Sequence, residues 1–193
     1  MELILIILSY LLGSIPTGYI VGALAGVDIR EVGSGNVGAT NVARTVGKRR
    51  GLLTLIADVA KGFVPVFVAG HLDFSQTAIA LVAIAAFLGH LYPMFLKFQG
   101  GKGVATALGV LLALAPMATL ILSAVFGVVA VSSRFVSLSS IVAALAAPIV
   151  LWSLSHSLTV IATGVFLAVM ITVRHRGNIE RLLAGTEPKF GAR

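Results

Sequence analysis

Six long stretches of the chain are almost wholly apolar, and short polar segments separate them. They cover residues 3–25, 52–70, 78–96, 104–131, 136–152 and 158–173. A helix that crosses a bilayer needs roughly 20 apolar residues, so most of these stretches have about the length of one membrane span. The stretch 104–131 is long for one crossing and short for two. Pro116 lies near its middle, where a proline breaks or kinks a helix.

Basic residues in the connecting segments orient these spans. The segment 28–50 carries Arg and Lys and 97–103 carries Lys, whereas 71–77 carries neither. Such basic residues are enriched on the cytoplasmic side. The C-terminal tail is also basic, with Arg174, Arg176, Arg181, Lys189 and Arg193. Two short passes hinged near Pro116 place this tail inside, and a re-entrant pair gives the same parity. We predict one all-α domain over residues 1–193, a polytopic membrane helix bundle of about seven transmembrane helices with the N-terminus out and the C-terminus cytoplasmic.

Composition supports a membrane protein and excludes several functions. Hydrophobic residues make up 58% of the chain and charged residues 11%, against roughly 25% charged in soluble domains. The net charge of +7 comes without the basic, water-exposed face that a nucleic-acid binder needs. No nucleic acid is therefore expected as a partner, and the charge suits an anionic membrane surface or phosphorylated substrates. The chain has no cysteine, which excludes thiolate zinc sites and cysteine nucleophiles.

The densest polar motif runs from Gly33 to Asn41. Its glycines let consecutive backbone N–H groups turn toward one anion. Side chains add further donors, with Arg44 about one helical turn beyond. The string matches a dinucleotide-binding fingerprint, but no strand precedes it and Asp58 lies in an apolar helix. We predict a cradle for a phosphate or acyl-phosphate group, the alternative being a tight re-entrant turn between two helices.

A second motif, Gly100-Gly101-Lys102-Gly103, opens an apolar helix. Backbone donors and the positive end of a helix suit an anion, and Lys102 supplies a point charge. The alternative is a simple membrane-boundary anchor. Just upstream, His90 lies inside an apolar helix, where it either satisfies a buried polar network or helps to position a substrate.

Polar residues near the C-terminus form a third motif. In a helix that continues past Arg174, His175 and Asn178 are neighbours at three-residue spacing. A positive-inside anchor explains the arginines of this segment but neither of these two residues. Ser140, near the start of the 136–152 helix, is either a helix cap or a contact to a substrate hydroxyl.

Asp58 and Lys61 lie three residues apart inside an apolar helix. Charges at such depth are costly and are usually paired or functional, so we predict a supporting pair that orients a loop. The sequence has no G-x-S-x-G elbow, no H-E-x-x-H and no carboxylates spaced for two metals. We expect no metal or cofactor, and a reaction that uses an already activated, phosphate-bearing donor.

Taken together and in order, these motifs resemble those of the bacterial acyl-phosphate-dependent glycerol-3-phosphate acyltransferases, the PlsY family. They run from Ser34 to Asn41, from Gly89 to Pro93, from Gly100 to Thr106 and from His175 to Leu183. The resemblance implies a multi-pass enzyme of the bacterial inner membrane with its active site facing the cytoplasm. The implied reaction transfers a fatty acyl group from acyl phosphate to the 1-hydroxyl of sn-glycerol 3-phosphate. The products are lysophosphatidic acid and phosphate, and no protein partner is required.

On this basis we assign roles to individual residues as a hypothesis. Acyl phosphate is assigned to Ser34, Gly35, Asn36, Gly38, Thr40 and Asn41. Glycerol 3-phosphate is assigned to Arg44, Lys102, Ser140, His175 and Asn178, of which Lys102, His175 and Asn178 are also catalytic. Supporting roles go to His90, Gly101, Gly103, Asp58 and Lys61. The general base stays open between His175 and a phosphate oxygen of the substrate.

A transporter for a small phosphorylated anion is the alternative function. Such proteins also use glycine-broken helices and half-helix ends. The polar motifs of this chain, however, are all expected on one face of the membrane, and the outer half offers no polar path. The sequence therefore favours the enzyme.

Overall fold

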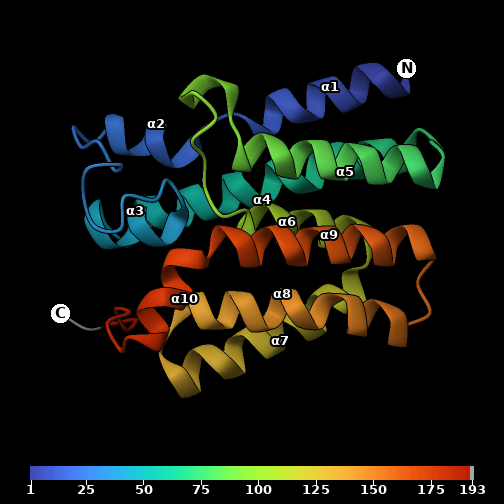
Figure 1. Ribbon diagram of the computed structural model, residues 1–193. Helices are drawn as coiled ribbons and strands as arrows, with labels where there is room; N and C mark the ends of the chain where they lie inside the picture. Colours follow the sequence, from blue (N-terminus) through green and yellow to red (C-terminus); the bar gives the residue numbers. More distant parts are fainter. Residues whose placement is uncertain (192–193) are drawn as a thin grey trace. The chain divides into compact units, whose positions relative to one another are not determined.

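The computed structural model describes residues 1–191, which are helical with no strand among them (Figure 1). The prediction of an all-α chain is confirmed. Within lipid the backbone N–H and C=O groups find no water, and helices satisfy these groups internally. Arg193, counted above in the basic tail, lies outside the described residues.

The chain forms two compact units, which meet in sequence at Ala113 and Leu114. The first contains α1 (Glu2–Gly13), α2 (Thr17–Ala23), α3 (Ala39–Thr45), α4 (Lys48–His71), α5 (Gln76–Leu91), the 3-10 turn η1 (Met94–Leu96) and nearly all of α6 (Val104–Leu114). The second contains α7 (Pro116–Ser133), α8 (Val136–Ser153), α9 (Leu158–Arg174) and α10 (Arg176–Leu183). Each unit has its own core, and a single domain over residues 1–193 stays a prediction.

Glycines set the closest helix packing of the first unit. A Cβ built on Gly13 of α1 would overlap the backbone of Ala86 in α5, and one on Gly89 of α5 would overlap the carbonyl oxygen of Tyr10. Small residues let backbones approach closely in this way, which is how membrane helices gain packing energy. The crossing of α1 and α5 fixes the end of α5, from which the glycine–lysine segment departs.

In the second unit α8 packs against both α7 and α9, and Leu151 of α8 and Leu167 of α9 are buried. The chain bends by 58° where α9 ends at Arg174 and α10 begins at Arg176. The straight continuation of the last helix considered above is therefore wrong. His175 is the residue at the bend.

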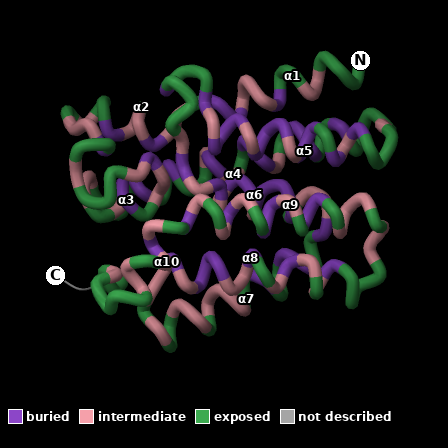
Figure 2. The backbone as a smooth tube through the Cα atoms, viewed as in Figure 1, coloured by how far each residue is buried: buried purple, intermediate pink, exposed green. Residues whose placement is uncertain are grey.

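Among the described residues, five helical stretches have the length and apolar composition of a membrane span, or six if the bent pair α9–α10 counts as one. Large apolar side chains stay uncovered along them, for example on α1 and α7 (Figure 2). The helix break expected near Pro116 is present, because α6 ends at Leu114 and α7 begins at Pro116. α6 is only about 16 Å long at 1.5 Å per residue, short of the roughly 30 Å core of a bilayer. The number of crossings and their orientation stay predictions.

Candidate active site

The glycine-rich segment before α3 is organised around the side chain of Asn41. The Asn41 amide donates to the carbonyl oxygens of Ile29, at 2.9 Å, and Val32, at 3.1 Å, and its Oδ1 accepts from the backbone N–H of Ser34 at 2.9 Å. Asn41 is buried. Because every one of these contacts is to the segment's own backbone, Asn41 holds the loop in shape.

The loop leaves several donors uncovered. Ser34, Gly35 and Thr40 are exposed, and Gly35 has a φ of +68°, a conformation that glycine adopts without strain. The exposed Arg44 lies one turn beyond Asn41 in α3 and makes no ion pair within the described residues. Nearby, Asn36 accepts from the N–H of Gly38 at 2.8 Å, a local turn contact. The loop therefore presents hydroxyls, a left-handed glycine and a cation on one short stretch of chain.

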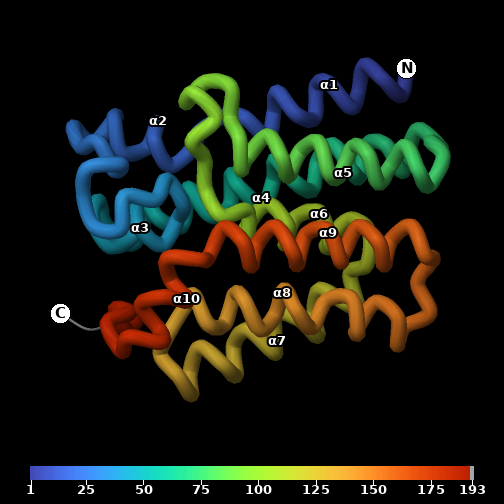
Figure 3. The backbone as a smooth tube through the Cα atoms, viewed as in Figure 1, coloured from blue at the N-terminus to red at the C-terminus, as the bar shows by residue number. Residues whose placement is uncertain are grey.

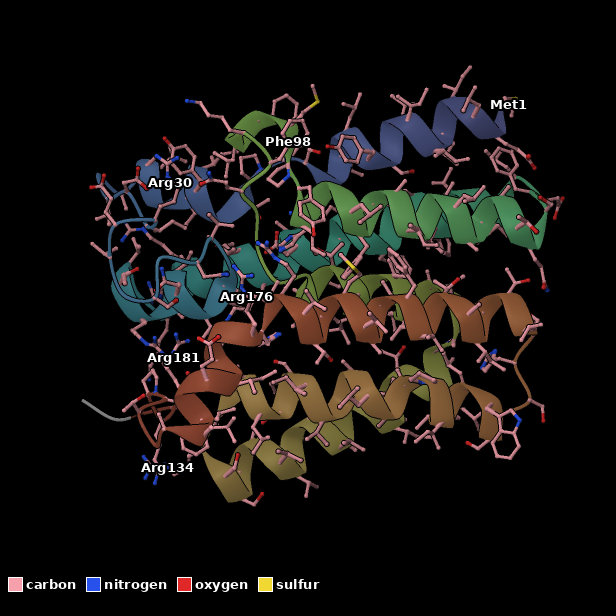
Figure 4. The ribbon with its side chains drawn as sticks, viewed as in Figure 1. Met1, Arg30, Phe98, Arg134, Arg176 and Arg181 are labelled. Carbon is pink, nitrogen blue, oxygen red and sulfur yellow. The ribbon has the colours of Figure 1, made fainter. Side chains whose placement is uncertain are left out.

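An ion pair fixes the turn that leads into this loop. The Arg30 guanidinium lies 2.5 Å from Oδ2 of Asp28, and the same guanidinium lies over the ring of Tyr19. Arg30 is labelled in Figure 4. Hydrogen bonds from the side chain and backbone of Arg30 lower the pKa of Asp28 to about 2, and the carboxylate raises the pKa of Arg30. The pair therefore stays charged at neutral pH.

The glycine–lysine segment packs tightly on the end of α5. The N–H groups of Gly100 and Gly101 donate to the carbonyl oxygens of Leu91 and His90, each at 3.1 Å. A Cβ on Gly101 would overlap the imidazole of His90, and Gly103 has a φ of +83°. These glycines are required by close packing, and half-buried Lys102 lies between two buried ones. The N–H groups of Gly100 and Gly101, which the sequence predicted as donors to an anion, are thus already bonded to α5.

The first unit also contains a buried ionic cluster. Nζ of Lys61 lies 2.9 Å from Oδ1 of Asp58 and donates to the carbonyl oxygen of Ile15 at 3.1 Å. The hydroxyl of Thr17 donates to the same Asp58 oxygen, and Nδ1 of His90 lies 3.7 Å from it. The pairing expected for two charges in an apolar helix is therefore present. The cluster joins the α1–α2 break, α4 and α5.

In the second unit the bend after α9 places His175 and Asn178 one turn apart. The N–H of Asn178 donates to the carbonyl oxygen of His175 at 2.8 Å, and Nδ1 of His175 lies 2.8 Å from the carbonyl oxygen of Ile171. A carbonyl only accepts, so this contact assigns a ring proton to Nδ1. The hydroxyl of Ser140 donates to the carbonyl oxygen of Val136 at 2.8 Å. The two predicted residues His175 and Asn178 are thus adjacent.

Glu187 is the residue of this unit that sequence reasoning missed. Its carboxylate accepts from Ser137 and Asn178, each at 2.6 Å, and from Arg181 at 2.8 Å. Burial acts to raise the pKa of Glu187, but these three hydrogen bonds outweigh it, and the pKa lies below the ordinary 4.5. The sequence marks Glu187 only as one of two acids, with Glu180, in a basic tail.

The structure therefore groups the predicted residues into sets, each described within its own unit. In the first unit Ser34–Arg44 form one segment, and Gly101, His90, Asp58 and Lys61 form a continuous series of contacts. In the second, His175 and Asn178 belong together and Glu187 holds Asn178. Within the part of the chain that is described, no three His, Asp or Glu side chains are arranged to hold a metal ion.

Comparison with known proteins identifies the family. The profile of the glycerol-3-phosphate acyltransferase family matches residues 3–185. The chain belongs to the glycerol-3-phosphate acyltransferase family. A glycerol-3-phosphate acyltransferase of Geotalea daltonii is 49% identical over 189 residues, covering 98% of this chain and 97% of the relative. That of Geobacter metallireducens is 52% identical over 191 residues, covering 99% and 98%.

Solved structures of the integral membrane glycerol 3-phosphate acyltransferase PlsY (YgiH) have the same fold. The glycerol 3-phosphate form matches with a TM-score of 0.96 and 44% identity, over 98% of this chain and 96% of that one. The lysophosphatidic acid form matches with a TM-score of 0.93 and 43% identity, over 98% and 95%. The predictions of the family and of a polytopic integral membrane protein are confirmed, and the chain is an acyltransferase.

Proposed function

We propose that the protein transfers a fatty acyl group from acyl phosphate to the 1-hydroxyl of sn-glycerol 3-phosphate, a step of phospholipid biosynthesis. The hydroxyl oxygen bonds to the acyl carbon, the bond from that carbon to the phosphate oxygen breaks, and the hydroxyl proton passes to a base. The products are lysophosphatidic acid and inorganic phosphate. The observation that carries the proposal is the family match over residues 3–185, joined to the glycerol 3-phosphate and lysophosphatidic acid forms of the PlsY structures.

The choice of donor rests on chemistry and on the motif resemblance. Acyl phosphate is a mixed anhydride whose leaving group is phosphate, so it needs charge stabilisation more than it needs a nucleophile from the protein. Both substrates are anions that repel each other until cations and N–H donors offset their charge. The uncovered donors of the glycine-rich loop, with Arg44 and Lys102, have that chemistry.

In the first unit, we assign the head of acyl phosphate to the loop residues Ser34, Gly35, Asn36, Gly38 and Thr40. Asn41 serves by keeping that loop in shape, because its amide is already bonded to the loop's own backbone. Arg44 and Lys102 bind glycerol 3-phosphate through its phosphate, where a guanidinium and an ammonium suit the charge.

In the second unit, we assign His175, Asn178 and Ser140 to glycerol 3-phosphate. Nε2 of His175 is the candidate to accept the hydroxyl proton, because Nδ1 is engaged with Ile171. A phosphate oxygen of the substrate is the alternative acceptor. The His175→Ala variant separates them, since near-normal turnover from about pH 6 to about pH 9 would exclude the histidine base.

The ionic cluster has a supporting role in this proposal. Asp58 and Lys61 hold the break between α1 and α2 through Thr17 and Ile15. His90 packs on Gly101 and so fixes the segment that carries Lys102. Gly103 continues that packing against the ring of Phe87.

The protein is proposed to act in the bacterial inner membrane with its substrates bound from the cytoplasm. Its partners in this proposal are the lipid bilayer and the two substrates, without a protein carrier. Reconstituted vesicles test the activity directly. Labelled glycerol 3-phosphate is expected to become lipid-soluble only after acyl phosphate is added, whereas uptake of the label without conversion would contradict the proposal and indicate transport.

A further inference from the structure

A short hairpin, residues 92–99, joins α5 to the glycine–lysine segment (Figure 3). Its base is closed by the hydrogen bonds from Gly100 to Leu91 and from Gly101 to His90. Within it, the N–H of Phe98 donates to the carbonyl oxygen of Pro93 at 2.9 Å. The hairpin is therefore a defined turn with a closed base.

One side of the hairpin is attached to the rest of the first unit. Leu96 is buried in a small core with Ile29, Val37 and Val42. At the base, the hydroxyl of Tyr10 in α1 donates to the carbonyl oxygen of Tyr92 at 2.7 Å. These contacts hold the hairpin in one orientation on the unit.

The other side of the hairpin is apolar and uncovered by protein. Met94 is 46% exposed, Phe95 57% and Phe98 60%. Lys97 and Phe98 have φ values of +51° and +61°, in the left-handed region that residues other than glycine seldom adopt. Figure 4 labels Phe98 on the hairpin, at the edge of the first unit. In water, three large apolar side chains on one short turn would be an unfavourable surface.

We propose that this hairpin inserts into the headgroup region of the bilayer leaflet into which α5 emerges. The apolar span that begins at Gln76 continues through η1 to Leu96, so the hairpin lies where the span leaves the hydrocarbon. Aromatic side chains concentrate at that depth. A lysine among them extends its ammonium to the lipid phosphates while its methylene groups stay in the apolar layer. Lys97, between Phe95 and Phe98, has this arrangement.

Anchoring the hairpin would also set the depth of Lys102, three residues past its end, because Gly100 and Gly101 connect the two rigidly. This consequence, unlike the insertion itself, rests on the proposed role of Lys102. At that depth, the ammonium group of Lys102 would lie level with the phosphate group of a donor whose acyl chain is in the bilayer.

A single-tryptophan experiment tests the insertion. The chain has one tryptophan, Trp152, so Phe98→Trp in a Trp152→Phe background reports on the hairpin alone. The protein is reconstituted in phosphatidylcholine–phosphatidylglycerol vesicles with brominated acyl chains. Loss of emission to bromine, with little loss to aqueous iodide, is the expected result. Quenching by iodide and not by bromine would place the hairpin in water and overturn the proposal. Resistance to both quenchers would show a protein cover and would overturn it as well.

Two further measurements keep the result independent of folding and of function. Met94→Trp in the same background repeats the experiment from a second exposed position on the hairpin. The unmodified protein calibrates it, because Trp152 is 72% exposed on the apolar helix α8. Failure of the acyl-phosphate assignment would leave the quenching result unchanged, so the two hypotheses fail separately.

Discussion

The side-chain amide of Asn178 donates a 2.6 Å hydrogen bond to Oε1 of Glu187. One residue of the predicted site is thus oriented by a residue outside every motif. The same carboxylate binds Ser137 of α8 and Arg181 of α10. Glu187 therefore ties the C-terminal tail, α8 and α10 together around Asn178.

Replacing Glu187 by glutamine is expected to lower both stability and activity. The amide group cannot accept from Arg181 and Asn178 as a carboxylate does, and a hydrogen bond to a charged group contributes about 1.5–3 kcal/mol. The melting temperature in detergent and kcat/KM should both fall. Glu180→Gln is the matched control, since Glu180 is exposed and its carboxylate makes no ion pair among the described residues. Equal behaviour of the two variants would contradict the role of Glu187.

The docking of the tail should also depend on pH. The folded-state pKa of Glu187 lies below its ordinary value of 4.5. Stabilisation by this carboxylate is therefore fully present above the unfolded pKa and is lost as pH falls through the folded pKa. Hydrogen exchange of the backbone amides in 184–190, Pro188 excepted, should show constant protection near neutral pH and a loss only in acid, once corrected for its intrinsic pH dependence. A loss between neutral and mildly alkaline pH would require a different group.

Asn41→Asp tests whether Asn41 holds the loop. The carboxylate keeps the acceptor for Ser34 but loses both donors and faces the carbonyl oxygens of Ile29 and Val32. Unsatisfied buried groups cost about 1–3 kcal/mol each, so activity should fall by about 100-fold and stability should fall with it. Thr40→Ala, on an exposed neighbour, should lower kcat/KM with no change in melting temperature. An unchanged melting temperature in Asn41→Asp would show that the amide serves binding alone.

A double-mutant cycle tests the buried pair of Asp58 and Lys61. Removing one partner leaves a buried charge uncompensated, at a cost of about 3–5 kcal/mol. Asp58→Asn and Lys61→Met should therefore each be strongly destabilising, and the double variant should recover much of the loss. Thermal unfolding in detergent, followed by Trp152 fluorescence, measures the coupling. Additive losses would mean that the two residues act independently.

The features of this structure that depend on neighbouring residues were predictable from the sequence. The apolar runs predicted the long helices, and Pro116 predicted the break between α6 and α7. The cost of charge in lipid predicted that Asp58 and Lys61 would pair. Each of these features depends on residues that are close in the sequence, so the sequence pattern predicts it.

Long-range contacts were not predictable in the same way. An asparagine in a glycine-rich loop has the same chemistry whether it binds a ligand or its own backbone, so the sequence did not separate these roles for Asn41. Glu187 contacts Ser137, which is 50 residues away, and no periodicity marks such a pair. The 58° bend at His175 arises without a proline, and its sequence suggested a helix that simply continued.

Donor specificity is the most direct test of the proposed reaction. The purified protein in vesicles is supplied with glycerol 3-phosphate and, in parallel, with acyl phosphate, acyl-CoA or acyl carrier protein bearing the same acyl chain. Lysophosphatidic acid and inorganic phosphate should form together, in equal amounts, with acyl phosphate alone. Comparable product from either thioester, or product from acyl phosphate without phosphate release, would contradict the proposed reaction.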